Sequence, residues 1–174
     1  RDGYVLSGTD PGTSGAWGAK AWYPTANGYY YALFWDKMPD LNYANPAVTA
    51  EMQNVAKFWL EEMGVDGFRL DYAIGPVQEF WAAFRKQTRR ANPECWTFGE
   101  VVDHPDVQRS FEGLLDGCLD FLMLEGIRQT FAFENWPASR LASFLDRHEA
   151  FFQSNFTRPS FLDNHDMNRF LWVV

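Results

Sequence analysis

Residues 65–71 read VDGFRLD, and this short apolar stretch is predicted to be a strand with a helix on either side of it. Before it, Asn45 and Pro46 form a helix-start signal, and apolar residues then recur at helical spacing as far as Gly64. After it, residues 77–91 carry apolar side chains on one face and basic side chains near the end, where the helix dipole favours cations. The order helix, strand, helix therefore begins here.

The same alternation continues along the rest of the chain. Each further strand is predicted from a short apolar run, and each further helix from apolar residues at helical spacing. Strands that alternate with helices of this length favour right-handed βαβ units and a parallel sheet, which is an α/β fold. The predicted strands lie at residues 95–101, 118–124 and 158–163, and the predicted helices lie at about 106–115, 127–133 and 139–152.

The composition limits the classes of partner. The 174 residues include 15 Lys and Arg against 23 Asp and Glu, and this net charge of -8 argues against nucleic acid and against an anionic membrane surface. No run approaches the roughly 18 apolar residues of a membrane span. Cys95 and Cys118 show no metal-ligand spacing, so we expect buried free thiols rather than a disulfide. The two cysteines leave the compartment undecided.

Charged residues stand where the predicted strands end. The period of two in a strand places Arg69 and Asp71 on one face of residues 65–71. Buried charges are costly unless they are paired, so this is either a structural ion pair or a nucleophile held ionised by a neighbouring cation. Glu100 ends the second strand, after a glycine that permits close backbone approach. Barrels of parallel strands place their catalytic residues at this end of the strands.

Four stretches resemble signature regions of the α-amylase family, and they occur in the family's order. They are MPDLN at 38–42, GFRLDYAIG at 67–75, TFGEVV at 97–102 and FLDNHD at 161–166. The resemblance implies a partial (β/α)8 barrel, about strands four to seven, over residues 45–174. It also implies that residues 1–44 are part of the loop domain inserted after barrel strand three. By pattern alone, residues 1–41 show no helical or alternating period, and the run near 29–34 predicts one short strand.

The resemblance implies a role for each matched residue. Asp71 is expected to be the nucleophile, Glu100 the general acid/base and Asp166 the carboxylate that stabilises the transition state. Arg69 and His165 are expected to bind substrate. The implied activity is retaining hydrolysis of α-glucosidic bonds in starch-like or malto-oligosaccharide substrates, which needs one ionised carboxylate about 5 Å from a second that first donates a proton. No cofactor is required for this chemistry, and a structural calcium ion is possible without assigned ligands.

The chain also departs from the family pattern. The first signature, at the end of barrel strand three, is absent, and the chain stops in the apolar run FLWVV, so we expect a longer protein that supplies the remainder of the barrel. Ile74 and Gly75 stand where many α-amylases carry Lys and His, so preference on the leaving-group side is open. The linkage specificity is open as well.

Other interpretations remain beside the main one. The protein could be a catalytically silent carbohydrate-binding or scaffold protein of the same fold, or a metal-dependent hydrolase that uses Asp163, His165 and Asp166 as ligands. His104 and His148 have no motif support and are expected at the surface or in loops. The aromatic side chains of the N-terminal segment could stack on sugar rings or pack the lobe; they are Trp22, Tyr29, Tyr30 and Trp35.

Overall fold

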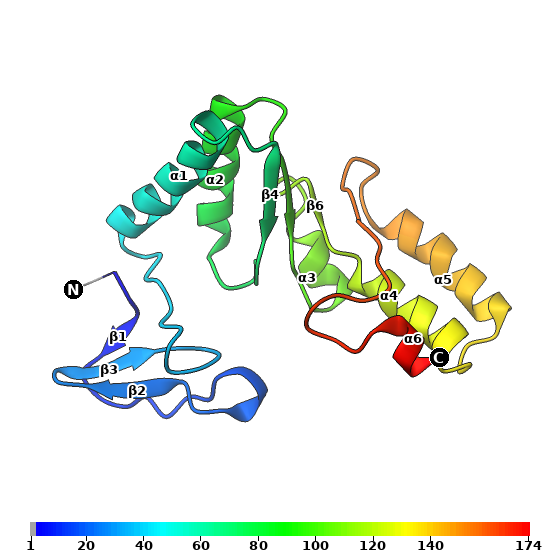
Figure 1. Cartoon of the computed structure of the whole chain (residues 1–174), viewed down its shortest axis with the longest axis horizontal. Helices are drawn as coiled ribbons and strands as arrows, with labels where there is room; N and C mark the ends of the chain where they lie inside the picture. The colour runs from blue at the N-terminus through cyan, green and yellow to red at the C-terminus, as the bar shows by residue number, and fades with distance from the viewer. Residues whose placement is uncertain (1–2) are drawn as a thin grey trace. The chain divides into compact units, whose positions relative to one another are not determined.

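The computed structural model describes residues 3–174 (Figure 1). The chain forms two compact units, which meet in sequence between Phe58 and Trp59, inside helix α1 (Pro46–Glu61). Asn45 begins this helix, because its Oδ1 accepts a hydrogen bond from the backbone N–H of Ala47 at 2.9 Å. The predicted helix start is therefore confirmed. The division into a loop domain over 1–44 and a barrel over 45–174 stays a prediction.

The first unit contains a small antiparallel sheet. Its three strands are β1 (Leu6–Ser7), β2 (Trp22–Thr25) and β3 (Gly28–Tyr31), in the order β1-β3-β2, and a short 3-10 helix, η1 (Ala16–Gly18), precedes β2. The strand expected near 29–34 is present as β3, whereas β1 and β2 were not predicted. Their period is hard to recognise because polar and aromatic residues occupy both faces of such short strands.

Aromatic pairs hold strands β2 and β3 together. The rings of Trp22 and Tyr31 lie 5.1 Å apart, and those of Tyr23 and Tyr30 lie 5.7 Å apart. The register places each of these pairs directly opposite across the two strands. Cross-strand aromatic pairs of this kind contribute about 0.2–1 kcal/mol each. For Trp22 and Tyr30, the contacts thus support the packing interpretation.

Asp40, in the MPDLN stretch, ties this small unit together. Its backbone N–H donates to the Tyr31 carbonyl and its own carbonyl accepts from Val5, both at 3.0 Å. Its carboxylate accepts the backbone N–H of Leu33 at 2.8 Å. Burial raises the pKa of the Asp40 carboxyl group, and the Leu33 N–H opposes that rise. The stretch therefore has a visible structural role in joining the strand ends.

The second unit contains a parallel sheet. Its three strands, β4 (Gly67–Leu70), β5 (Trp96–Gly99) and β6 (Gly117–Cys118), lie side by side in chain order. The connections contain α2 (Gln78–Ala91) between β4 and β5, and α3 (Pro105–Arg109) between β5 and β6. Consecutive βα units in a parallel sheet confirm the predicted α/β fragment of a (β/α)8 barrel.

The outer face of this sheet packs on helix α2. Phe80, Trp81 and Phe84 are buried on α2, and the ring of Phe84 lies 5.9 Å from that of Phe68 on β4. Because strand side chains alternate, Phe68 on the helix side sends Arg69 to the opposite face. The two-residue period read from the sequence therefore describes β4 correctly.

The third strand is much shorter than predicted. Residues 118–124 were expected to be extended, but β6 ends at Cys118 and helix α4 (Phe121–Ile127) follows. Asp120 causes the change, because its carboxylate accepts the backbone N–H of Met123 at 2.9 Å and so caps the helix. Most of the apolar run that looked like a strand is therefore the first turn of this helix, in which Leu124 is buried.

The prediction of a fourth strand at residues 158–163 is wrong, because no regular strand forms there. Thr157 alone forms a parallel bridge, with Gly117, and it donates to the Asp116 carbonyl at 2.8 Å and accepts from Cys118 at 3.1 Å. Pro159 accepts one further hydrogen bond, from Asp120 at 3.1 Å, but has no N–H to donate in return. The missing N–H of Pro159 therefore ends the parallel ladder just after the bridge between Gly117 and Thr157.

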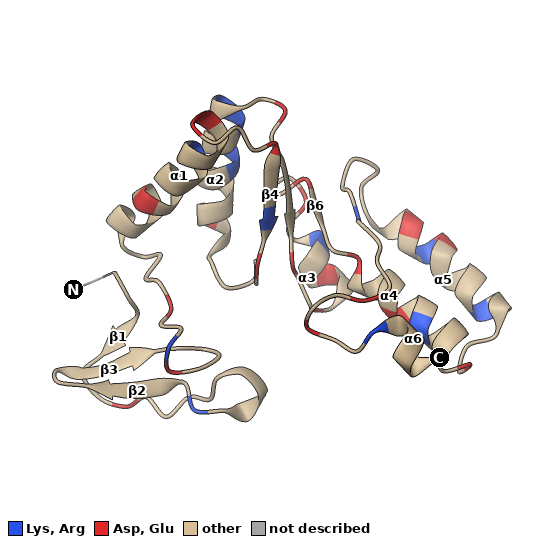
Figure 2. Cartoon of the chain, in the orientation of Figure 1, with Lys and Arg blue, Asp and Glu red and all other residues tan. Residues whose placement is uncertain are grey.

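Helices make up most of the remaining chain. Helix α4 continues as a π-helix, η2 (Arg128–Ala132), and is followed by α5 (Ala138–Phe151) and the short α6 (Phe170–Val173). The helix expected at 127–133 thus begins earlier, and the one expected at 106–115 ends at Arg109. Acidic and basic side chains alternate along α5 (Figure 2). None of the helices within residues 3–174 is long and apolar enough to span a membrane.

His148 on α5 is buried, which contradicts the expected surface position. Only 6% of this residue is exposed, and its Nε2 lies 2.8 Å from Oδ2 of Asp120. Its ring stacks on Phe144 at 5.2 Å and meets Phe152 edge-on at 5.4 Å. The spacing of four residues places Phe144 and His148 on one face of α5 and the C-cap residue Phe152 next to that face. This signal is missed when each histidine is considered alone. His104 is exposed, as expected.

Both cysteines are buried free thiols, as the sequence predicted. Cys118 lies on β6 and Cys95 directly before β5. Burial raises the pKa of the Cys118 thiol to about 12. This thiol is therefore protonated and chemically inert near neutral pH.

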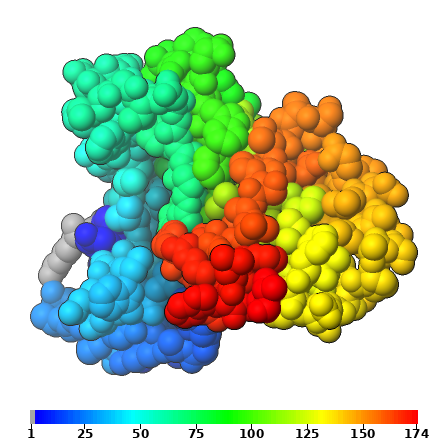
Figure 3. Space-filling model, turned by 45° about the vertical axis from the view of Figure 1, so that its right-hand side comes forward, coloured from blue at the N-terminus to red at the C-terminus, as the bar shows by residue number. Residues whose placement is uncertain are grey.

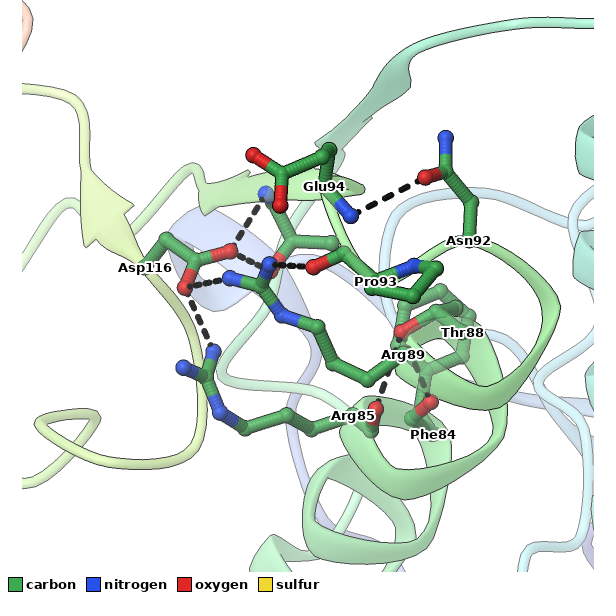
Figure 4. A network of polar contacts seen from close by, with 9 residues as sticks. Phe84, Arg85, Thr88, Arg89, Asn92, Pro93, Glu94 and Asp116 are labelled. Atoms are coloured by element: carbon green, nitrogen blue, oxygen red, sulfur yellow. Dashed lines mark hydrogen bonds and ion pairs between the residues drawn. The ribbon is translucent and has the colours of Figure 1, made fainter.

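A partly buried carboxylate ties the amino-terminal ends of β5 and β6 to helix α2 (Figure 4). Asp116 directly precedes β6, and its Oδ1 accepts from Arg85 and from Arg89, both at 2.7 Å. Its Oδ2 accepts the backbone N–H of Thr97 at 2.9 Å. Burial alone would raise the pKa of Asp116, but the hydrogen bonds from Arg85, Thr97 and Arg89 hold it below its ordinary value of 3.8.

Replacing Asp116 with Asn is expected to lower the free energy of unfolding by about 2–3 kcal/mol, since two arginines lose their partner while a third of each stays exposed. The difference in unfolding free energy between wild type and variant is largest above the unfolded-state pKa of Asp116. It decreases as the pH falls through the lowered folded-state pKa, because wild-type Asp116 then also becomes neutral. Urea unfolding at several pH values measures it. Asp146→Asn, on the exposed face of α5, is the control; an equal effect of both changes would contradict the prediction.

Candidate active site

Two of the candidate carboxylates emerge side by side from the sheet. Strands β4 and β5 are adjacent and parallel, with Leu70 opposite Gly99 at their carboxyl ends. The next residues are Asp71 and Glu100, and the backbone N–H of Glu100 still donates to the Leu70 carbonyl at 2.8 Å. The hydrogen-bonded register therefore fixes both carboxylates at the same end of neighbouring strands.

Arg69 binds both of these carboxylates. Its Nη1 pairs with Oδ1 of Asp71, and its Nη2 lies 2.7 Å from Oε1 of Glu100. In Figure 2 the basic band on β4 is followed by an acidic one at the end of the strand. The exposed fraction of the side chain is 13% for Glu100 and 69% for Asp71. One guanidinium thus draws together an enclosed carboxylate and an accessible one.

The backbone after Asp71 folds around Glu100. The N–H of Tyr72 donates to Oε2 of Glu100 at 3.3 Å, and the N–H of Ala73 donates to the Glu100 carbonyl at 2.9 Å. Tyr72 has φ of 42°, in the left-handed region, which costs a residue with a side chain about 1–3 kcal/mol. Strain of this kind concentrates at functional sites. The sequence contained no signal for the contribution of Tyr72, because every residue type except proline supplies the same N–H.

Gly99 makes room for this arrangement. A Cβ atom at this position would lie 2.8 Å from Cδ1 of Leu115 and 2.9 Å from Cβ of Ala73, closer than real contacts allow. Gly99 directly precedes Glu100, so a side chain here would displace the backbone that positions the carboxylate. The close approach expected from the sequence is therefore present.

His165 and Asp166 lie in a loop, residues 163–167, that follows the interrupted strand. Nε2 of His165 is 3.2 Å from Oδ2 of Asp166, and 72% and 63% of these side chains are exposed. The N–H of Asp166 donates to Oδ1 of Asn164 at 2.9 Å. Within the described part of the chain, no polar contact joins either residue to Arg69, Asp71 or Glu100. The structure thus joins Arg69, Asp71 and Glu100 by direct polar contacts, while His165 and Asp166 pair with each other.

Asp163 anchors the 163–167 loop to the segment that follows it. Its Oδ2 accepts the N–H of Phe170 at 2.9 Å, and its Oδ1 pairs with Arg169 at 2.7 Å. These two hydrogen bonds, that of Phe170 first, hold the pKa of Asp163 below its ordinary value. Asp163 is therefore already engaged in a structural contact at the start of helix α6.

The residues present do not form a metal site. Across residues 3–174, no three side chains of His, Cys, Asp or Glu come together in a way that could hold a metal ion. The interpretation as a metal-dependent hydrolase required Asp163, His165 and Asp166 to converge, and Asp163 instead binds Arg169. The structural calcium ion that the resemblance suggests stays a prediction, because calcium also binds backbone and Asn carbonyl oxygens.

Comparison with known proteins gives one consistent result. The family model for the alpha amylase catalytic domain matches residues 3–174. Alpha-amylase 2 of Dictyoglomus thermophilum is 37% identical over 156 residues, which are 89% of this chain and 28% of that protein. The intracellular maltogenic amylase of Bacillus subtilis is 30% identical over 154 residues, 84% of this chain and 25% of that protein.

A solved structure agrees with the sequence matches. The crystal structure of alpha-amylase from H. orenii superimposes with a TM-score of 0.78 and 33% sequence identity, over 98% of this chain and 38% of that one. The chain therefore spans less than two fifths of the length of each of these three relatives.

Proposed function

Because this chain belongs to the alpha-amylase family, we propose that the protein hydrolyses α-glucosidic bonds of starch-like or malto-oligosaccharide substrates with retention of configuration. The observation that carries the proposal is the pairing of Asp71 and Glu100 on the single guanidinium of Arg69. Retaining enzymes hold their two carboxyl groups about 5–5.5 Å apart, closer than the roughly 6.5–9.5 Å of inverting enzymes. Two carboxylates that share one guanidinium fit the closer arrangement.

In the first step of the proposed reaction, a carboxylate oxygen of Asp71 attacks the anomeric carbon of the sugar. The bond between that carbon and the glycosidic oxygen breaks, and Glu100 transfers its proton to the departing oxygen. The products are a glycosyl ester of Asp71 and the leaving saccharide, whose former glycosidic oxygen is now a hydroxyl group. The exposure of Asp71 allows this attack.

In the second step, Glu100 acts as a base. It takes a proton from a water molecule, whose oxygen attacks the anomeric carbon and releases Asp71 as a carboxylate. Two displacements at one carbon restore its original configuration. Asp166 would stabilise the positive charge that develops on the sugar in both transition states, while His165 and Arg69 would hold the substrate and the nucleophile.

The stereochemistry of the first product tests the proposal. Proton NMR recorded directly after maltoheptaose is added should show the α-anomer before mutarotation mixes the two forms. Activity is measured on the longest natural form of the protein that contains this chain, because the relatives are much longer. Initial formation of the β-anomer would contradict retention, and binding of maltoheptaose without any turnover would contradict hydrolysis.

Mass spectrometry locates the nucleophile independently. A fluorinated glycosyl fluoride that forms its ester quickly and loses it slowly should leave a sugar attached to the peptide that contains Asp71. Attachment at another carboxylate would contradict the proposed role of Asp71.

A further inference from the structure

A single arginine closes the base of the 163–167 loop. Arg128 lies where α4 passes into the π-helix η2, and its Nε and Nη2 donate to the Leu162 carbonyl at 3.3 and 3.2 Å. The same Nη2 donates to the Asn168 carbonyl at 2.6 Å. One guanidinium therefore binds the residue before the loop and the residue after it.

The other polar contacts of the loop are local. Asp163 bonds to Arg169 and to the Phe170 N–H just after the loop, and Asp166 bonds to Asn164 within it. In the described chain, the polar contacts that tie residues 162–168 to a distant part of the sequence come from Arg128. Without Arg128, the loop would keep its local polar contacts but lose its polar contacts with a distant part of the sequence.

A π-helix begins at Arg128. The N–H of Phe133 donates to the Arg128 carbonyl at 2.9 Å, a bond across five residues that widens the turn. Helix α6, which begins just past the loop, packs against η2, and the space-filling view shows the last residues of the chain lying against this region (Figure 3). Widened turns of this kind occur frequently at functional sites.

We propose that Arg128 is a positioning residue that fixes Asp166 for catalysis through the 163–167 loop, without contacting the substrate itself. The inference rests on the proposed function, since it assigns Asp166 to the transition state. The guanidinium has several donors in a fixed plane, so it can bind two carbonyl groups at once. A lysine ammonium at the same place would keep the charge but not this planar fork.

Kinetics of three variants test the proposal on maltoheptaose. Arg128→Met should lower kcat about 100-fold, the effect of a catalytic group displaced by about 1 Å, while KM stays near the wild-type value. Arg128→Lys should lower kcat about tenfold, because it restores part of the contact. Arg140→Met is the matched control, because Arg140, on α5, lies over the ring of Trp136. This variant should keep the wild-type kcat.

A double-mutant cycle separates positioning from a general loss of structure. If Arg128 acts through Asp166, then Arg128→Met should change kcat by less than about threefold in an Asp166→Asn background. A purely structural role predicts that the two losses multiply, and this outcome would overturn the proposal.

Hydrogen exchange measures the position of the loop without any substrate. In Arg128→Met, the backbone amides of residues 162–170 should exchange at least tenfold faster than in Arg140→Met. Opening of the loop then no longer requires the hydrogen bonds from Arg128 to the Leu162 and Asn168 carbonyls to break. The peptide over β4 and β5 should exchange as in wild type. Unchanged exchange over 162–170 would overturn the inference.

These results also separate the inference from the proposed function. If Asp166→Asn keeps the wild-type rate, the role of Asp166 is wrong and the positioning role falls with it, whatever the exchange data show. If Asp166→Asn is inactive while Arg128→Met retains wild-type kcat, the proposed function stands and the inference about Arg128 is overturned.

Discussion

Replacing Asp71 with Asn is expected to lower kcat on maltoheptaose about 10⁴-fold, which is the scale of losing one member of a catalytic group. The amide is nearly the same size as the carboxylate but carries no charge to attack the anomeric carbon. It also pairs less strongly with Arg69, which keeps its contact with Glu100. Because the lost interaction forms with the reacting carbon, kcat and kcat/KM should fall together.

Asp66→Asn is the matched control for this prediction. Asp66 is an exposed residue just before β4, so the same chemical change is made at the opposite end of the same strand. Its kcat should stay within about twofold of wild type, as expected for a surface change. Comparable rates for wild type and Asp71→Asn would remove Asp71 from the mechanism.

Replacing Glu100 with Gln is expected to lower kcat on maltoheptaose about 10³-fold, within the range that general acid–base groups contribute. The loss should depend on the leaving group. With α-maltosyl fluoride, the first turnover should be slowed less than about tenfold, because fluoride departs without a proton. Rapid-quench measurement of the fluoride burst separates this step from the slow hydrolysis that follows.

Glu94→Gln supplies the control at the other end of β5. Glu94 is exposed and bonds through its backbone N–H to Asn92, far along the strand from the reacting groups. Wild-type rates are expected with both substrates. If Glu100→Gln slowed the two substrates equally, Glu100 could not be the proton donor to the leaving group.

The repeating elements of the barrel could be read from the sequence because each was coded locally. Phe68 and Arg69 on opposite faces of β4 follow from a period of two, and α1 begins at Asn45 as its capping chemistry predicts. The ends of elements were harder. Asp120 caps a helix inside an apolar run, and Pro159 removes a donor from a strand that is otherwise in register. The cap is a local contact with Met123, hidden in an apolar run, whereas the pairing that Pro159 interrupts joins segments that are distant in sequence.

The residues of the candidate site also fall into those that the sequence predicted and those that it did not. That Asp71 and Glu100 lie together follows from two strands ending in acids, given a parallel sheet. The donor from Tyr72 and the clamp from Arg128 act on backbone atoms or through them, so residue type gives little warning of either. The partner of His148 was missed because Asp120 is distant in sequence, although the aromatic spacing on α5 marked that face as buried.

The placement of Asp116 has a consequence for adaptation. Its two arginine contacts lie at the start of β5 and β6, whereas Arg69, Asp71 and Glu100 meet at the far end of β4 and β5. Substitutions near Asp116 that change thermal stability can therefore be selected almost independently of substitutions near Arg69 that change turnover, because the two sets lie at opposite ends of the strands.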